Sequence, residues 1–162
     1  FERLVVPRDL GYDDILPRDQ AEEKGPLTAG AQNLMALYDS LKMCKFALMA
    51  GVDLDTMATW TNQVTGWDLT PGEMLQIGER IHNLRRLYNL RLGISFADDT
   101  LPARILMQPR GEGSGGDLVP PLGRMIADYY VARGWAPDGR PTAEKLRALG
   151  LEAEGAEVGI GL

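Results

Sequence analysis

Apolar residues recur every three or four positions along most of the chain, which is the spacing of one face of an α-helix. This period begins at Leu27 and runs to about Leu41. It returns in a second segment that Asp53 can cap at its start and Gly66 can end. No segment alternates apolar and polar residues for long enough to indicate a β-strand. The pattern therefore predicts an all-α, multihelical domain of about five to seven helices.

The third helical segment carries the clearest signals. Thr70, Pro71 and Glu73 form a capping box with proline at the first helical position. One apolar stripe then continues for five turns, and Gly93 can end the helix. We expect one continuous helix over residues 70–92. Its expected buried residues are Met74, Ile77, Ile81, Leu84 and Tyr88.

The rest of the chain divides by its proline and glycine content. Residues 1–26 are rich in both and predict an irregular lead-in, whereas 27–150 form the helical core. Within that core, shorter helices are expected at 98–107, 118–132 and 142–149, with a loop at 109–117. The tail at 151–162 is acidic and glycine-rich, so we expect it to be flexible. We interpret residues 1–162 as a single domain.

Composition narrows the function classes. The 162 residues carry a net charge of −6, which argues against nucleic acid or an anionic membrane as the main partner. A single cysteine excludes an internal disulfide and favours the cytoplasm. No run approaches the ~20 apolar residues that a membrane span needs, and we expect no signal peptide at the start of the chain. Because the chain begins at Phe1, we expect it to be a fragment of a longer protein.

The cysteine belongs to a motif at the end of the first helical segment, where Asp39 and Cys44 frame the string D-x-x-K-M-C. Further blocks read GERIHNLRRLYNLR at 78–91, DDTLP at 98–102, DYYVARGW at 128–135 and GRPTAEKLRALGL at 139–151. Their order and spacing resemble the C-terminal helical portion, part of the third domain, of the tungsten-containing aldehyde ferredoxin oxidoreductase family. The family's form of the first motif is D-x-x-G-L-C.

The resemblance implies cofactor-binding roles for Asp39, Met43 and Cys44. In the family the aspartate contacts the pterin of a tungsten (or molybdenum) bis-pterin cofactor, and the cysteine is one metal ligand of a four-iron four-sulfur cluster. A carboxylate such as Asp39 can accept paired hydrogen bonds from pterin N–H groups. A four-iron cluster takes four thiolates, and this chain has one. The isolated chain is therefore expected to hold no cofactor and to be inactive; the catalytic residues stay unknown.

The resemblance also implies a function. The full-length enzyme would oxidise an aldehyde to a carboxylic acid and pass electrons through the cluster to ferredoxin, with upstream domains as further partners. One alternative is a non-catalytic helical interaction module that keeps the family fold. Another is a related reductase subunit that acts on aromatic thioesters. Asp39 together with Cys44 favours the first reading, and the oligomeric state stays open.

Three positions depart from the family pattern. Lys42 replaces the usual glycine and Met43 the usual leucine, and glycine there would indicate a positive φ or a close cofactor approach. A continuous helix would place Asp39 and Cys44 about 140° apart, so we expect a turn near Lys42 and an accessible thiol. His82, the only histidine, replaces a tryptophan, and we expect it to be partly buried and structural.

Overall fold

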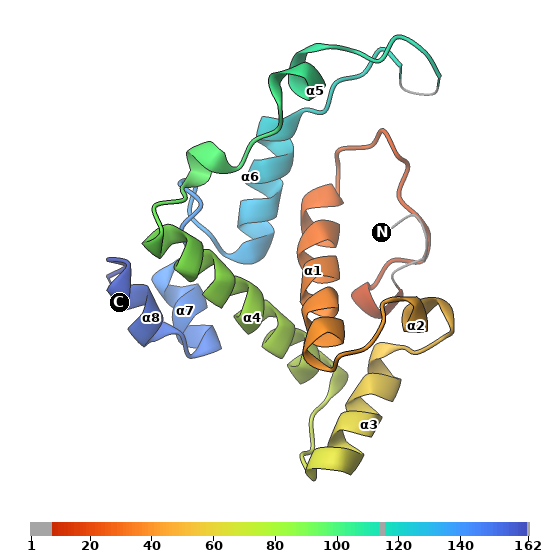
Figure 1. Cartoon of the computed structure of the whole chain (residues 1–162), viewed down its shortest axis with the longest axis vertical. Helices are drawn as coiled ribbons and strands as arrows, with labels where there is room; N and C mark the ends of the chain where they lie inside the picture. The colour runs from red at the N-terminus through yellow and green to blue at the C-terminus, as the bar shows by residue number, and fades with distance from the viewer. Residues whose placement is uncertain (1–7, 114–115, 162) are drawn as a thin grey trace.

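The computed structural model describes residues 8–113 and 116–161, and within these ranges the fold is all-α, as expected (Figure 1). Residues 1–7 of the lead-in, 114–115 of the loop and 162 of the tail lie outside the described residues. The elements are η1 (Arg8–Leu10), α1 (Lys24–Ser40), α2 (Phe46–Met49), α3 (Leu54–Thr65), α4 (Pro71–Arg91), η2 (Phe96–Asp98), α5 (Ala103–Met107), α6 (Leu122–Arg133), α7 (Ala143–Leu149) and α8 (Glu152–Glu157).

The described part of the chain has eight α-helices, more than the five to seven expected. The short helices α2 and α8 account for the difference, because four and six residues are too few to show a helical period. Both lie in stretches that the apolar pattern treated as connection or tail. In the same described residues, the only β-pairing is an isolated bridge between Trp135 and Pro141.

Helix α1 is the centre of the fold and packs against both α4 and α6 (Figure 1). Two glycines allow these close contacts. A Cβ atom on Gly78 of α4 would lie 2.2 Å from the backbone oxygen of Asn33 in α1. A Cβ atom on Gly25 would lie 2.6 Å from the backbone nitrogen of Tyr129 in α6. Glycine therefore sets how closely the three helices approach.

Two clusters of buried apolar side chains hold the remaining helices. The first joins the end of α1 to α3 and the start of α4, and it comprises Leu34, Leu37, Tyr38, Leu54, Met57, Ala58 and Met74. The second joins α4 to α7 and to the start of α8, and it comprises Leu87, Leu146, Leu149 and Leu151. Thus α4 buries side chains in both clusters.

The long helix α4 begins as predicted. The Thr70 hydroxyl accepts a hydrogen bond from the Glu73 amide at 3.2 Å, and the Glu73 carboxylate accepts one from the Thr70 amide at 2.8 Å. The buried face differs from the expected stripe. Leu84 and Tyr88 are 45% and 61% exposed. The face is instead formed by Met74, Gly78, Asn83, Arg86 and Leu87. Asn83 accepts a buried hydrogen bond from the Trp135 ring N–H, and Arg86 donates one to the Gly139 carbonyl. These bonds allow two polar side chains to be buried.

The two ends of the chain also differ from the expectation. Of the lead-in, the described residues before α1 hold η1 and turns, and α1 begins at Lys24 rather than at Leu27. The tail, expected to be flexible, folds into α8, and Leu151 beside it is only 2% exposed. Ile160 packs against the second apolar cluster. The apolar residues of the tail are therefore packed in the second apolar cluster, and this packing stabilises the tail despite its glycine content. No helix in the described ranges has the length and apolar character needed to cross a membrane.

Candidate functional site

The motif that contains the cysteine forms a turn at the end of α1. The Lys42 amide donates to the Asp39 carbonyl at 3.2 Å, and the Met43 amide donates to the Tyr38 carbonyl at 2.9 Å. These two bonds, with Lys42 at a φ of 58°, define a Schellman cap. The turn near Lys42 that the sequence predicts is therefore present.

Lys42 adopts a backbone conformation that suits glycine. For a residue with a Cβ atom, this left-handed region costs roughly 1–2 kcal/mol. The structure thus gives a reason for a glycine at this position of the motif, because the cap requires a positive φ. Lysine is accommodated here, but with local strain.

The three predicted cofactor-binding residues face different surroundings. The Asp39 side chain is 71% exposed, and its carboxylate lies 3.9 Å from the Arg85 guanidinium. Cys44 is an exposed free thiol, so the thiol is accessible as expected. Met43 is half-buried and packs against the first apolar cluster. Met43 therefore anchors the turn while Asp39 and Cys44 remain open to a ligand.

The donor set of this turn suits part of a cofactor site. Among the described residues, no group of three or more His, Cys, Asp or Glu side chains could hold a metal ion. Cys44 can supply one thiolate, and Asp39 can accept N–H hydrogen bonds through a carboxylate that is mostly free. The turn fits a cluster ligand and a pterin contact that other protein groups must complete.

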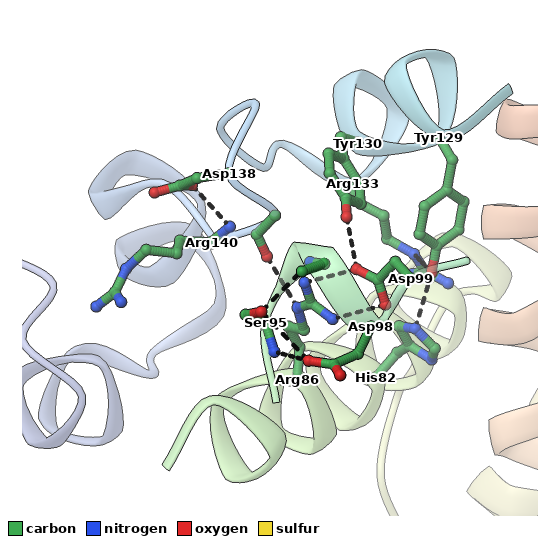
Figure 2. A network of polar contacts seen from close by, with 12 residues as sticks. His82, Arg86, Ser95, Asp98, Asp99, Tyr129, Tyr130, Arg133, Asp138 and Arg140 are labelled. Carbon is green, nitrogen blue, oxygen red and sulfur yellow. Dashed lines mark hydrogen bonds and ion pairs between the residues drawn. The ribbon is translucent and has the colours of Figure 1, made fainter. Parts of the chain in front are cut away.

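A second polar region, which the sequence reasoning missed, lies between α4, α6 and the turn at 98–101 (Figure 2). The buried Arg86 guanidinium binds both carboxylate oxygens of Asp99, at 3.1 and 2.8 Å, and donates to the Gly139 carbonyl. The Tyr130 hydroxyl donates to Asp99 at 2.5 Å. Burial and this bond to the carboxylate raise the pKa of Tyr130 to about 12.

A second arginine organises the neighbouring face of α6. Arg133 is 1% exposed and donates to four acceptors. They are the Ala29 carbonyl, the Gln32 and Asn33 amide oxygens and the Tyr129 hydroxyl. The Tyr129 hydroxyl also lies 2.9 Å from Nε2 of His82. Figure 2 shows these two side chains pointing toward one another. This network joins α1, α4 and α6 through side chains about 100 residues apart in the sequence.

His82 is held in a desolvated, cationic setting. Its ring stacks on Trp135 with 6.2 Å between ring centroids and an interplanar angle of 14°. Burial and the nearby charges of Arg133, Arg85 and Arg86 lower the pKa of His82 to about 4. The expectation of a partly buried histidine is confirmed, and the side chain is neutral near pH 7.

These side chains line a cavity of about 570 Å³. Arg85 lines it and also pairs with Asp39, so the cavity adjoins the turn that carries Cys44. Asp99 and Tyr130 were part of the motifs noted in the sequence, but the pattern did not show which polar residues face inward. The sequence feature that could have pointed to this cavity is the pair Arg85 and Arg86 in α4, because both arginines line it.

Comparison with known proteins gives the family. The model of the family described as aldehyde ferredoxin oxidoreductase, domains 2 and 3, matches residues 4–151. The chain belongs to this family.

Its relatives include two proteins named tungsten-containing aldehyde ferredoxin oxidoreductase. The Pyrococcus abyssi protein is 40% identical over 92% of this chain, and the Thermococcus kodakarensis protein is 39% identical over 91%. This chain spans about a quarter of the length of each.

The motifs that resemble the aldehyde ferredoxin oxidoreductase family serve mainly to pack helices in this structure. Gly78, in the block at 78–91, permits the contact of α1 with α4. Asp99, in the block at 98–102, neutralises Arg86, and Arg133, in the block at 128–135, connects α6 to α1. These blocks support the frame that presents the turn at Asp39–Cys44.

Proposed function

We propose that this chain is the C-terminal part of a tungsten-pterin oxidoreductase that oxidises aldehydes to carboxylic acids. In that reaction an aldehyde and water give the acid, two protons and two electrons. The electrons would leave through a four-iron four-sulfur cluster to ferredoxin, in the cytoplasm. Support comes from family membership, from the names of the relatives and above all from the turn that exposes Asp39 and Cys44 together.

Each residue of the turn has a distinct role in this proposal. Cys44 provides one thiolate ligand of the cluster, and the remaining ligands come from the preceding part of the enzyme. The Asp39 carboxylate accepts N–H hydrogen bonds from the pterin. Met43 fixes the turn by packing on the apolar cluster beneath it. When bound, the tungsten-pterin group supplies the two-electron chemistry, and this chain supplies position and charge.

The test replaces the two residues separately in the full-length gene product. Cys44→Ser removes a thiolate, so we expect the protein to lose iron and the spectroscopic signal of a reduced cluster. Asp39→Asn removes charge but keeps shape, so we expect weaker pterin and tungsten retention with iron unchanged. Asp55→Asn, an exposed aspartate of α3, is the matched control. Full iron in the purified Cys44→Ser protein would contradict the ligand assignment.

The alternative of a non-catalytic helical module rests on Lys42, which departs from the family motif. Metal analysis of the unaltered full-length gene product separates the two functions. Stoichiometric tungsten and iron support the oxidoreductase, whereas their absence after growth with both metals supports the module. Activity toward aldehydes rather than aromatic thioesters then separates the proposed enzyme from a thioester reductase. For the 162-residue chain by itself, we still predict that neither tungsten nor iron is retained.

A further inference from the structure

We propose that the cavity between α1, α4 and α6 binds a small organic carboxylate that carries a hydroxyl group. Arg85 would hold the carboxylate, and Nδ1 of His82 would accept the hydroxyl hydrogen. This inference is independent of the proposed function, because neither Cys44 nor a cofactor enters it. The hydrogen bonds around His82, the charges that line the cavity and its size carry the argument.

The hydrogen bonds determine which nitrogen of His82 carries the proton. Arg133 can only donate, so the Gln32 atom 2.5 Å from its guanidinium is the amide oxygen. The Tyr129 hydroxyl lies 2.7 Å from that oxygen and must donate its single hydrogen there. The Tyr129 oxygen then accepts from Arg133 and, at 2.9 Å, from Nε2 of His82. His82 therefore carries its proton on Nε2, and Nδ1 has a lone pair.

That lone pair is available to a ligand. His82 lines the cavity, and no described side chain or backbone group donates to its Nδ1. Among the described residues, every buried side-chain nitrogen or oxygen atom has a hydrogen-bond partner, so an unbonded Nδ1 must reach solvent. Because His82 lines the cavity, we assign the cavity as the route by which solvent or a ligand reaches this atom. A neutral imidazole nitrogen of this kind accepts a hydrogen bond from a hydroxyl group.

The cavity lining carries two arginines, Arg85 and Arg86, and two aspartates, Asp98 and Asp99, so the case for an anion rests on how these charges are paired. Asp99 is neutralised by Arg86, and the Asp98 carboxylate accepts hydrogen bonds from the Ser95 amide and hydroxyl. Arg85 is 59% exposed, and its one acidic contact among the described residues is Asp39 at 3.9 Å.

Buried Arg133 adds a positive charge behind the wall, because the acceptors described for it are all neutral. Arg85 is therefore the lining cation most free to bind a carboxylate.

Geometry and size fit a ligand with both groups. Residues three apart on a helix share a face, with about 5–6 Å between their Cβ atoms, so His82 and Arg85 can contact neighbouring groups of one molecule. Leu101, Leu122 and Ile126 supply an apolar part of the wall. A volume of about 570 Å³ suits a small ligand with an aromatic or aliphatic body.

The experiment measures binding of three related probes to the full-length gene product by titration calorimetry. Mandelate has a carboxylate, a hydroxyl and a ring. Phenylacetate lacks the hydroxyl, and 1-phenylethanol keeps the hydroxyl on the same carbon but has a methyl group in place of the carboxylate. We expect mandelate to bind best, phenylacetate about 3- to 10-fold more weakly and 1-phenylethanol at least about 10-fold more weakly. Equal affinities, or no saturable mandelate binding by about 10 mM, would overturn the proposal.

Two variants assign the two contacts. Arg85→Gln should abolish the preference for mandelate over 1-phenylethanol and keep the preference over phenylacetate. His82→Phe should abolish the preference for mandelate over phenylacetate and keep the preference over 1-phenylethanol. Arg147→Gln, an exposed arginine on α7 away from the cavity lining, should change neither preference. Melting curves check that each variant folds, and His82→Gln replaces His82→Phe if the latter does not. Preferences that persist unchanged in folded Arg85 and His82 variants would refute the site.

Discussion

At the scale of single residues, Lys42 and His82 each lie in surroundings that disfavour the residue: a positive φ for Lys42 and nearby positive charges for a protonated His82. Lys42 has a φ of 58° in the turn after α1, a conformation that disfavours side chains with a Cβ atom. His82 is neutral among three arginines that oppose its protonation. At both positions the residue differs from the one that the motif resemblance leads us to expect, and each has a measurable consequence for stability.

Lys42→Gly should stabilise the protein. Relief of left-handed strain of roughly 1–2 kcal/mol exceeds the extra entropy of an unfolded glycine, which costs about 0.4–1 kcal/mol, for a net gain of about 0.5–1 kcal/mol. Lys45→Gly is the matched control, because Lys45 has an ordinary helical φ of −56° and should lose stability. Urea unfolding of both variants measures the free energies. Destabilisation of similar size at both positions would show that the turn is not strained.

His82 should make folding sensitive to mild acid. The pKa of His82 is lowered in the folded state to about 4 from its usual 6.5. Above pH 6.5 both states hold it neutral. As the pH falls from 6.5 toward 4, the unfolded state binds the proton first, so stability drops by at most about 1.4 kcal/mol per pH unit.

The carboxylates of the protein also titrate in this range, so the comparison is with His82→Gln. The gap in unfolding free energy between the natural protein and this variant should narrow as the pH falls from 6.5 to 4. Parallel stability curves for the two proteins would show that His82 is not desolvated in the folded state.

At the scale of elements, α4 shows how tertiary contacts choose the buried face of a helix. Its start packs on the first apolar cluster and its later turns on the second, so no single straight stripe is buried. Leu87 faces the second cluster at 2% exposure, whereas Leu84, three residues earlier, is 45% exposed. Asn83 and Arg86 fill inward positions through hydrogen bonds to Trp135 and Gly139.

Leu87→Ala should therefore destabilise the protein far more than Leu84→Ala, although both remove the same atoms from one helix. Truncation of the buried leucine should cost about 2–5 kcal/mol through lost burial and a residual cavity. Truncation of the exposed leucine should cost less than about 1 kcal/mol. Chemical denaturation of the pair measures the difference. Equal losses of unfolding free energy would mean that Leu84 is buried as the sequence pattern predicts, which would contradict the buried face seen in the structure.

At the scale of the whole molecule, α1 connects the apolar cluster near the Cys44 turn to the polar cavity between α4 and α6. Its contact with α4 depends on Gly78, where a side chain would meet the backbone of Asn33. The ion pair between Lys145 and Glu79, at 2.8 Å, ties α7 to the same part of α4. A change at this contact should alter both the turn and the cavity.

Gly78→Ala should destabilise the protein by about 1–3 kcal/mol or more, because the added methyl group overlaps backbone that cannot rotate away. Gly72→Ala in the same helix is the control, since the nearest neighbour of its Cβ atom would be the Thr70 hydroxyl at 4.0 Å. That change should be neutral or stabilising by up to about 1 kcal/mol. Thermal unfolding compares the two, and a Gly78→Ala protein as stable as the control would show that α1 and α4 do not approach closely here.

The sequence by itself determined the features that depend on neighbouring residues. The capping box at Thr70, the glycine cap at Gly66 and the turn after Asp39 all form through bonds within a few positions, so their residue types reveal them. The family motif is likewise written in the order of residues. For these reasons the all-α class, the long helix and the exposed position of Cys44 followed from the sequence.

Only the tertiary structure decided which residues meet across the chain. Helical period shows that a face is apolar but not which neighbours cover it, so the exposure of Leu84 and the packing of the tail through Leu151 were missed. Arg133 reaches Gln32, 101 positions away, and thereby sets the hydrogen bonds of Tyr129 and His82. Such contacts depend on how helices pack, and a buried arginine is stable only where that packing brings its acceptors together.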